Sequence, residues 1–579
     1  MRKFDLQYSS FEHAGVSADR YVSPAGSDQN DGLTPDRPLK TIARAVYDLA
    51  PLHGTAVTIH LAPGVYAPST TGETFPVELF DYTVLAGEGP GETILDAEGS
   101  GSVLKMDKTG ETMVRDLTVT GGYESGVVCL ATSRAEFVNC RITRNAGKHG
   151  GGILCASESS PLFRNCRITD NTGDYGGGVC VEYSSNALLT GCEIRSNRAL
   201  AGGGVYASRA PFTCIDCLIT GNTADEAGGG VYANGDWIQL IRCRITDNSA
   251  IRGGGVRLYG GESQRITHCV ISGNTVTKYG GGIACLEAFP ALHNTLIYAN
   301  SAGTGGGGLH VRDGGADVLN CTIAGNAAPD GGGVLCRNAF DAVIRNSIIY
   351  FNYPAGISMN GTAPEITFSD VQDGIPGTGN MNADPLFIDL PGADFRLAQY
   401  ATGTPFQSPC VDGGDGPAAD AVVTEFGNRS PLADFTTRRD DVPDSGVVDM
   451  GYHYPAGPVD WVPAAEIHMQ SYYVEGHVFD IHLRLYNPGA ALEAVPVMFA
   501  LEIDQAFYFW PHWMPAVEWL RLRIPSGITD LDLVKPMNWP VGWPAQNQPY
   551  RAWCAMLTDD MSAILGEMDM FEWWFGPEE

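Results

Sequence analysis

Positive charge is scarce in this chain of 579 residues. It has 36 Lys and Arg residues against 67 Asp and Glu residues, which gives a formal net charge of −31. A field of that sign repels phosphate backbones and anionic membrane surfaces, because both are bound through basic patches. The composition therefore argues against a nucleic-acid partner.

Long apolar runs are also missing. No stretch reaches the roughly 18 apolar residues that a membrane-spanning helix requires. The first ten residues, MRKFDLQYSS, contain two cations with no apolar segment behind them, so we recognise no signal peptide there. We expect a soluble chain without membrane insertion, which either stays in the cytoplasm or has lost a leader.

Helical periodicity is lacking over most of the chain, and a repeat stands in its place. Glycine is abundant, with 72 residues, and glycine triplets recur at a nearly constant step from residues 150–152 to residues 331–333. A second sequence motif, which ends in asparagine, recurs at the same step. Its final asparagine is at positions 145, 171, 197, 222, 248, 274, 300, 326 and 352. Such a period, roughly 26 residues, is typical of a solenoid, in which each unit buries its apolar face against its neighbours.

The pattern inside one unit predicts strands. After each glycine triplet the first and third positions are mostly apolar, as in Val179 and Val181, while the second and fourth positions mix polar and aromatic residues, as in Tyr206. A period of two with one apolar face indicates a strand. We expect two or three short strands per unit, with equivalent strands stacked in parallel. The asparagine column predicts a ladder, because asparagine tolerates the left-handed turn conformation and its amide can bond to amides above and below.

The 15 cysteines do not predict a disulfide framework. Most of them occupy two inward columns of the repeat, where side chains on parallel strands lie about one strand spacing apart. That spacing exceeds the mean Cβ separation of about 3.8 Å in a disulfide. We expect buried free thiols that serve as small apolar fillers. The 12 histidines show no zinc-ligand spacing.

The segments before and after the repeat have a different sequence pattern. Near the N-terminus Leu39, Ile42, Ala43 and Val46 have the spacing of an amphipathic helix that can cover the open end of the first coil. From about residue 456 the glycine repeat stops, and nine of the ten tryptophans follow. Alternating apolar residues there predict several strands in a β-sandwich. Its aromatic residues could offer a surface for sugars or for a protein partner, and the alternative is that most of them pack in the core or between domains.

Several strings resemble those of a known group. The segment YVSPAGSDQNDGLTP from Tyr21, the helix PLKTIARAV, the strand LAPGVY and the repeats themselves resemble bacterial right-handed parallel β-helix proteins of the pectate-lyase-like superfamily. The strings ADPLF, SPCVDGGD and VDMGYHY look like the closing coils of such proteins. The resemblance implies an all-β chain with an N-terminal helix cap at 1–56, a single-stranded right-handed parallel β-helix at 57–455, and a small Trp-rich β-sandwich at 456–579. Each coil of the β-helix would contain about 26 residues, the period of the repeat. The resemblance also implies a secreted or cell-surface protein.

This resemblance does not specify an activity, because the fold hosts lyases, hydrolases, epimerases, phage tailspikes and plain surface proteins. The catalytic strings of the polygalacturonase-like hydrolases, of the uronate epimerases and of the pectate lyases are absent. Hydrolysis needs two carboxylates about 5 to 10 Å apart. The acids on the outward columns are instead scattered, at Glu182, Asp236, Glu262, Glu287 and Asp313.

One cluster fits a lyase. Such an enzyme needs a base that removes a proton next to a carboxylate of the substrate, and a cation that binds this carboxylate. The predicted catalytic residues are Arg257, His310, Arg312 and Arg337. The predicted substrate-binding residues are Tyr206, Tyr232, Tyr259 and Glu182. The alternative interpretation of all eight is an ordinary solvated face.

A metal requirement is left open. Oxygen ligands for Ca²⁺ could come from Asp412, Asp415, Asp420, Asp434, Asp440, Asp441 and Asp444. The alternative is that these acids pair with Arg438 and Arg439 in an ordered closing loop. Two functions survive: a scaffold that binds glycans or mediates adhesion without catalysis, which the missing strings favour, and a lyase acting on an acidic polysaccharide along the side of the β-helix.

Overall fold

The computed structural model describes residues 19–49, 57–235, 237–425, 428–455, 464–468, 472–473, 478–487, 492–503, 506–509, 520–524, 527–538, 550–556 and 569–575. The chain divides into two compact units. The larger one comprises Gly15–Ala421 and Leu432–Ala456, and the smaller one includes Val422–Pro431 and Gly457–Glu579. No helix in the described residues is long and apolar enough to cross a membrane.

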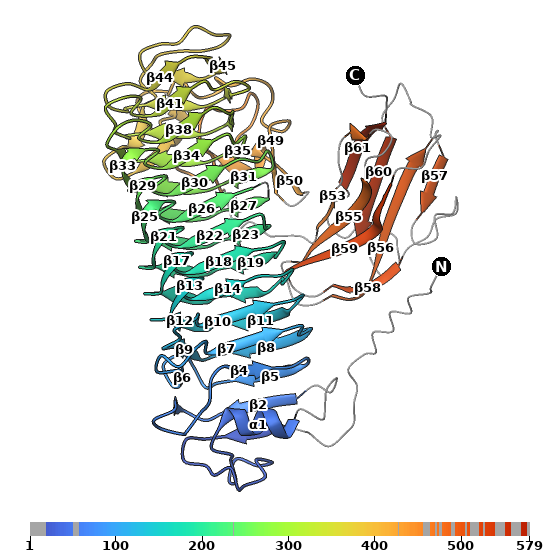
Figure 1. Ribbon diagram of the computed structural model, residues 1–579. Helices are drawn as coiled ribbons and strands as arrows, with labels where there is room; N and C mark the ends of the chain where they lie inside the picture. The colour runs from blue at the N-terminus through green and yellow to red at the C-terminus, as the bar shows by residue number, and fades with distance from the viewer. Residues whose placement is uncertain are drawn as a thin grey trace. The chain divides into compact units, whose positions relative to one another are not determined.

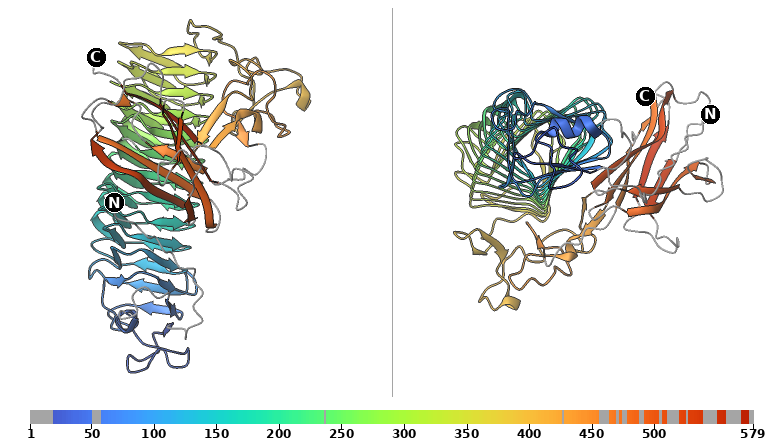
Figure 2. Two further views of the ribbon diagram at one scale, coloured as in Figure 1. Left: turned by 90° about the vertical axis from the view of Figure 1, so that its right-hand side faces the viewer. Right: turned by 90° about the horizontal axis from the view of Figure 1, so that it is seen from below.

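The larger unit is a parallel β-helix in which every coil adds one strand to each of several stacked sheets (Figure 1). Sheet A has 14 strands, from β1 (Arg20–Val22) and β2 (Val57–Leu61) to β45 (Glu365–Thr367), and sheet B has 13, from β3 (Gly64–Tyr66) to β46 (Asp370–Val371). Seen end-on, the coils superpose around a common axis (Figure 2). The predicted parallel β-helix is confirmed.

Two further sheets carry the predicted site residues. Sheet C consists of β4 (Val77–Leu79), β7 (Leu104–Asp107), β10 (Val127–Leu130), β14 (Ile153–Cys155), β18 (Val179–Glu182), β22 (Val205–Ser208), β26 (Val231–Asn234), β30 (Val256–Tyr259), β34 (Ile283–Leu286), β38 (Leu309–Arg312), β41 (Val334–Arg337) and β44 (Ile357–Asn360). Sheet D consists of β13 (Ala146–His149), β17 (Thr172–Tyr175), β21 (Arg198–Ala201), β25 (Thr223–Ala227), β29 (Ser249–Arg252), β33 (Thr275–Tyr279) and β37 (Ser301–Ala302). Sheet D runs into sheet C through the glycine triplets.

The core is the lumen of the β-helix. Val179, Val205 and Val231 pair in register on successive strands, and none of the three is exposed. The 14 cysteines described are all buried and free, and those of the inward columns lie in the lumen as predicted. Aligned columns of small and branched apolar side chains therefore fill the axis of the solenoid.

The asparagine ladder is confirmed. The side-chain amide of Asn197 donates to Oδ1 of Asn222 at 3.0 Å and to the backbone oxygen of Ile168 at 2.9 Å. Asn222 repeats this pattern toward Asn248 in the next coil. One expectation is corrected, because the left-handed residue is the one before each ladder asparagine, such as Ser196 with φ 55°. The asparagine is retained for its hydrogen bonds and not for its backbone conformation.

The glycine triplets are explained by close contact between coils. Gly176 has φ 68°, which favours glycine. A Cβ on Gly177 would lie 2.6 Å from the carbonyl oxygen of Gly203 in the next coil. The triplet thus lets the chain turn from sheet D into sheet C while the coils stay in contact.

The N-terminal cap is a helix, α1 (Ile42–Leu49), as predicted, although its buried face differs. Ile42, Ala45 and Leu49 are buried, whereas Ala43 and Val46 are only partly so. The helix begins after Leu39 because the carboxylate of Glu73 accepts the N–H groups of Ile42 and Ala43 at 2.6 and 3.0 Å. These bonds satisfy two backbone donors that a helix start leaves free.

Residues 383–421 and 432–455, in which the strings predict closing coils, return instead along the outside of the β-helix. They form two short antiparallel pairs, β47 (Phe387–Asp389) with β48 (Asp394–Leu397), and β51 (Phe435–Thr436) with β52 (Tyr454–Pro455). Gly451 N–H donates to the backbone of Asn346 at 2.8 Å, and His453 N–H donates to Oδ1 of Asn294 at 2.6 Å. The segment therefore crosses several coils.

The smaller unit is built of strands. They are β49 (Val422–Glu425), β50 (Asn428–Pro431), β53 (Ala464–His468), β54 (Tyr472–Tyr473), β55 (Val478–Asn487), β56 (Leu492–Ile503), β57 (Ala506–Phe509), β58 (Leu520–Ile524), β59 (Gly527–Asn538), β60 (Tyr550–Met556) and β61 (Asp569–Phe575). β53, β55 and β59 form one sheet, and β54 and β56–β58 with β60 and β61 form another. The expected strands are present, while the sandwich and its aromatic binding surface remain predictions.

Candidate functional site

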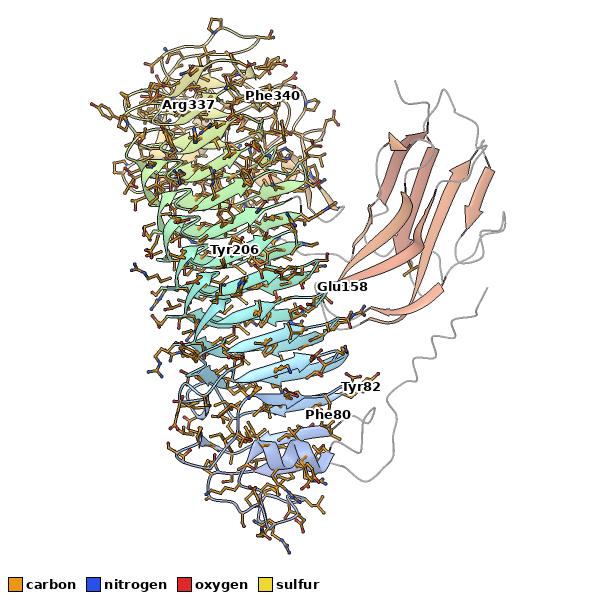
Figure 3. All side chains as sticks on the ribbon, in the orientation of Figure 1. Phe80, Tyr82, Glu158, Tyr206, Arg337 and Phe340 are labelled. Atoms are coloured by element: carbon orange, nitrogen blue, oxygen red, sulfur yellow. The ribbon has the colours of Figure 1, made fainter. Side chains whose placement is uncertain are left out.

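The outward face of sheets C and D carries a stripe of aromatic and cationic side chains. It combines residues at the second position of sheet C strands, two residues at the fourth position of β38 and β41, and residues that precede a glycine triplet at the end of sheet D. The stripe, which we call the Tyr-Arg stripe, comprises His149, Tyr175, Tyr206, Tyr232, Arg252, Arg257, Tyr279, His310, Arg312 and Arg337. Figure 3 labels Tyr206 and Arg337 on this face.

The first half of the stripe is a row of rings. Tyr175 lies 5.1 Å from Tyr206, and Tyr206 stacks on Tyr232 with ring centroids 5.2 Å apart and planes at 9°. Because one face of Tyr206 is covered by its neighbour, the row presents ring edges and hydroxyl groups more than open ring faces. Burial raises the pKa of Tyr206 to about 12, so the phenol is neutral and can donate a hydrogen bond. The predicted sugar-binding tyrosines thus offer hydroxyls, and their role in binding stays a prediction.

Arg257 follows Tyr232 in register on β30, with Ala284 on its other side. Its side chain is only 8% exposed. Within the described residues no carboxylate or other acceptor pairs with its guanidinium. Burial lowers the pKa of Arg257; Cys285 and Tyr232 raise it, while the charges of Arg252 and Arg312 lower it further. A largely buried cation without a protein partner is costly unless an anion binds to it.

His310 lies two strands further along, on β38. The residue is 4% exposed, and neither ring nitrogen has a hydrogen-bond partner among the described residues. The ring of Tyr279 stacks on it at 4.9 Å, and Cζ of Arg337 lies 5.0 Å from the Tyr279 centroid. Burial, and then the charges of Arg257 and Arg337, lower the pKa of His310 to about 3. The imidazole is neutral at physiological pH and covered by its neighbours.

Arginine charges on this part of the stripe are only partly balanced. Arg312 is exposed and donates from Nε to Asp313 at 2.9 Å. Nη2 of Arg337 lies 3.4 Å from Asp330. Arg257 is left without such a counterion among the described residues, so a positive site exists within a chain whose net charge is −31.

The predicted residues fall into two groups. Arg257, His310, Arg312 and Arg337 lie on the nearby strands β30, β38 and β41, and Tyr259 is on the same strand as Arg257. Glu182 lies elsewhere: β18 is five strands from β38, which is roughly 24 Å. Nδ1 of His149 is 3.1 Å from the Glu182 carboxylate. Glu182 is therefore not part of the arginine cluster.

Sequence reasoning overlooked the residues before the glycine triplets. His149, Tyr175, Arg252 and Tyr279 end the sheet D strands and face the stripe. They could have been found from the sequence, because they recur with the period of the repeat at the position directly before the glycine triplets. The alternation argument began only after the triplets, so it could not assign these side chains a direction.

Two of the scattered acids share a pocket of about 390 Å³ at the other edge of sheet C. Glu262 and Glu287 line it together with Trp237 and Phe289. Asp236 lies outside the described residues. Asp313 is partly exposed and pairs with Arg312.

The aspartates considered for Ca²⁺ do not converge in the described part of the chain. Four of them pair with basic side chains, as Asp415 with Arg345, Asp440 with Arg438, Asp441 with Arg396 and Asp444 with His453. The described residues contain one group of three metal-ligand types whose donor atoms lie within 4.8 Å, namely His149, Cys180 and Glu182.

Comparisons with known proteins concern the repeat region. The sequence family described as "Right handed beta helix region" matches residues 102–263 and 229–373. No curated protein matches the chain. Among solved structures, the A-module of the Azotobacter vinelandii mannuronan C-5 epimerase AlgE6 is 16% identical with a TM-score of 0.35, over 59% of this chain and 94% of that one. The A-module of AlgE4 from the same organism is 15% identical with a TM-score of 0.34, over 63% and 100%. The pectate lyase Pel9A is 12% identical with a TM-score of 0.30, over 75% and 96%.

The family match covers the same coils in which the structure shows parallel register, as from Val205 to Val231 and on to Val256. The larger unit is therefore a right-handed parallel β-helix.

Proposed function

We propose that this protein binds an anionic polysaccharide along the Tyr-Arg stripe as a non-catalytic scaffold. One observation carries the proposal: Arg257 is a largely buried cation with no acceptor among the described residues. A carboxylate of a uronic acid fits this requirement, because a guanidinium binds carboxylates through two parallel hydrogen bonds. Neighbouring phenol hydroxyls supply hydrogen bonds to sugar hydroxyls. An extracellular or cell-surface location is part of the same proposal.

The length of the stripe supports a polymer over a small ligand. From His149 on β13 to Arg337 on β41 it spans seven strand steps along sheet C, or roughly 34 Å. A solenoid with one repeated position presents similar groups at a constant spacing. Such a surface suits a chain of repeated sugar units.

Binding by wild-type protein and Arg257→Ala to a panel of acidic and neutral polysaccharides tests the proposal. We expect Arg257→Ala to weaken binding of acidic polymers at least roughly tenfold, since a charge-assisted hydrogen bond contributes about 1.5 to 3 kcal/mol. Arg141→Ala, an exposed arginine on sheet B, is the matched control. Unchanged binding by Arg257→Ala, or equal binding of neutral polymers, would contradict the proposal.

A lyase is the second candidate, and one observation favours it. His310 is a neutral imidazole without a hydrogen-bond partner in the described part of the chain, and the charges of three arginines lower its pKa. However, a pKa of about 3 makes it a weak base for removing a proton beside a carboxylate. Absorbance from unsaturated uronate, produced by wild type and lost in His310→Ala, would establish the lyase over the scaffold.

A further inference from the structure

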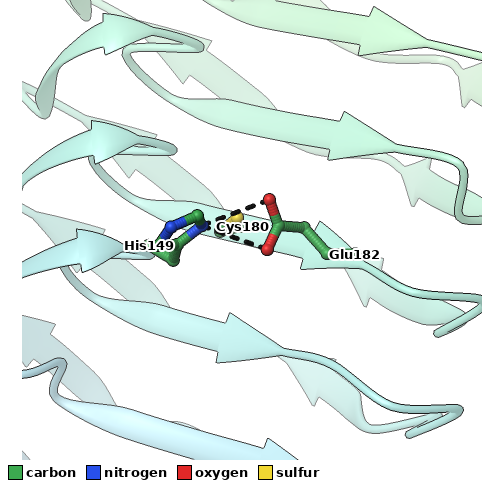
Figure 4. A group of neighbouring side chains, drawn as sticks. All are labelled: His149, Cys180 and Glu182. Carbon is green, nitrogen blue, oxygen red and sulfur yellow. Dashed lines mark hydrogen bonds and ion pairs between the residues drawn. The ribbon is translucent and has the colours of Figure 1, made fainter.

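A second cluster lies at the N-terminal end of the stripe. His149 ends β13, and Cys180 and Glu182 occupy the second and fourth positions of β18, so they face outward from neighbouring coils. Nδ1 of His149 is 3.2 and 3.1 Å from the two oxygens of Glu182. One ligand atom from each residue lies within 4.8 Å of the others, and Figure 4 shows the three side chains turned toward one another.

Cys180 differs from the other cysteines of the repeat. Those belong to the apolar cluster that fills the lumen, whereas Cys180 lies outside that cluster although it is fully buried. It stands in the outward column, in register with Tyr206. A luminal filling role therefore does not account for this thiol.

The donor set is that of a borderline divalent metal. Thiolate, imidazole and carboxylate are the three protein donors that Zn²⁺ uses, whereas Ca²⁺ and Mg²⁺ take oxygen ligands. With metal–ligand distances of about 2.0 to 2.3 Å, the donors would close by roughly 1 Å around an ion. The His149 side chain is 33% exposed, which gives solvent access to the cluster.

We propose that His149, Cys180 and Glu182 bind one Zn²⁺ ion between two neighbouring coils. Three protein ligands leave a fourth position of the tetrahedron for water or for an external ligand. The site lies five strands from His310, and of its three residues His149 also belongs to the Tyr-Arg stripe. The competing explanation is an ordinary ion pair beside a buried thiol.

The full chain offers an internal control for that explanation. His293 and Asp317 form a similar pair, with Nε2 and Oδ2 at 2.8 Å, but no third ligand type completes a cluster there among the described residues. Asp317→Asn should therefore leave metal binding unchanged. Cys180→Ala and Glu182→Gln should weaken it, and the two variants remove different donors, so a folding defect in one does not end the test.

The experiment is calorimetric titration of chelator-treated full-length protein with ZnCl₂, together with spectroscopy of the Co²⁺ form. We expect one Zn²⁺ per chain, a thiolate-to-cobalt charge-transfer band, and at least a roughly tenfold loss of affinity in Cys180→Ala and Glu182→Gln. Thermal unfolding of each variant shows whether it is folded. Zn²⁺ binding that is equally tight in folded Cys180→Ala, the absence of the Co²⁺ band in wild type, or an equal loss in Asp317→Asn would overturn the proposal.

Discussion

The rings of Tyr206 and Tyr232 stack with their centroids 5.2 Å apart and their planes 9° from parallel. Each ring therefore supports its neighbour, and the phenol groups form a row along the solenoid. Stacking stabilises the face of sheet C, while the hydroxyls are available to a ligand. The two contributions can be separated by substitution.

Tyr232→Phe keeps the ring and removes the hydroxyl. Under the proposed function we expect it to weaken polysaccharide binding several-fold, because one hydrogen bond is worth about 0.5 to 1.5 kcal/mol, with the thermal midpoint unchanged. Tyr232→Ala should weaken binding and also lower the midpoint. Affinity electrophoresis and thermal unfolding measure the two effects, and Tyr47→Phe, on a ring that is 73% exposed on α1, is the control. Identical binding by Tyr232→Phe and wild type would exclude a role for this hydroxyl.

Asn222→Ala should destabilise the β-helix strongly. It removes a buried side chain whose amide donates to Asn248 at 3.0 Å and to Ile194 at 2.9 Å, and whose oxygen accepts from Asn197 at 3.0 Å. The partners left without a bond each cost about 1 to 3 kcal/mol, so we expect a total loss of roughly 2 to 4 kcal/mol, measured by urea unfolding. Asn360→Ala, at an exposed position at the end of β44, should change stability by less than about 0.5 kcal/mol. Similar losses in both variants would show that the ladder is not a principal source of stability.

Gly177→Ala should disrupt the contact between coils. The added methyl group would lie 2.6 Å from the carbonyl oxygen of Gly203, and backbone on both sides prevents a simple adjustment. We expect a loss of about 1 to 3 kcal/mol or failure to fold. In Gly91→Ala the methyl group meets nothing within 4 Å, so that variant should be nearly neutral. Soluble yield and thermal midpoint check both, and a wild-type midpoint for Gly177→Ala would contradict the close-contact explanation.

The free energy of unfolding should decrease as the pH falls, and His310 should contribute to this decrease. Its pKa is lowered from 6.5 to about 3 in the folded protein, so between these values the unfolded chain binds more protons. The free energy of unfolding therefore decreases as pH falls from 6.5 toward 3, by at most about 1.4 kcal/mol per pH unit from this group. His310→Gln should show a shallower dependence in urea unfolding at several pH values. His60→Gln, at a half-exposed histidine paired with Asp19, serves as the comparison. An equal slope in His310→Gln and wild type would show that this imidazole is not the cause.

The repeat could be predicted well from the sequence because the order of residues within each coil determines its strands and turns. Three features depend only on residues in one coil and in the adjacent coil. They are the constant step between coils, the alternation after Gly176–Gly178 and the asparagine column that includes Asn222. Packing decided the rest. The buried face of α1 was misjudged because the carboxylate of Glu73, far from Ile42 in the sequence, fixes where the helix begins.

The candidate site was predicted only in part for a similar reason. Arg257 and His310 fall in an alternating strand, so their outward direction could be read from the sequence. Tyr279 precedes a glycine triplet, and its position over His310 depends on how sheet D turns into sheet C. Glu182 was grouped with Tyr206 on the adjacent strand but also with the distant Tyr259, because alternation gives the face of a side chain but not its partner.

The segment that returns along the outside binds the backbone or side chains of Asn346, Thr322 and Asn294, which belong to three consecutive coils. A solenoid without such a clasp can unzip one coil at a time from an end. Here the returning segment must dissociate from the C-terminal coils before these coils can unfold. Local unfolding should therefore begin in the other coils of the β-helix. Amide hydrogens of β36 (Leu296–Tyr298), β40 (Thr322–Ala324) and β43 (Ile348–Tyr350) should accordingly exchange with solvent more slowly than those of β16 (Arg167–Thr169) and β20 (Glu193–Arg195) in the same sheet.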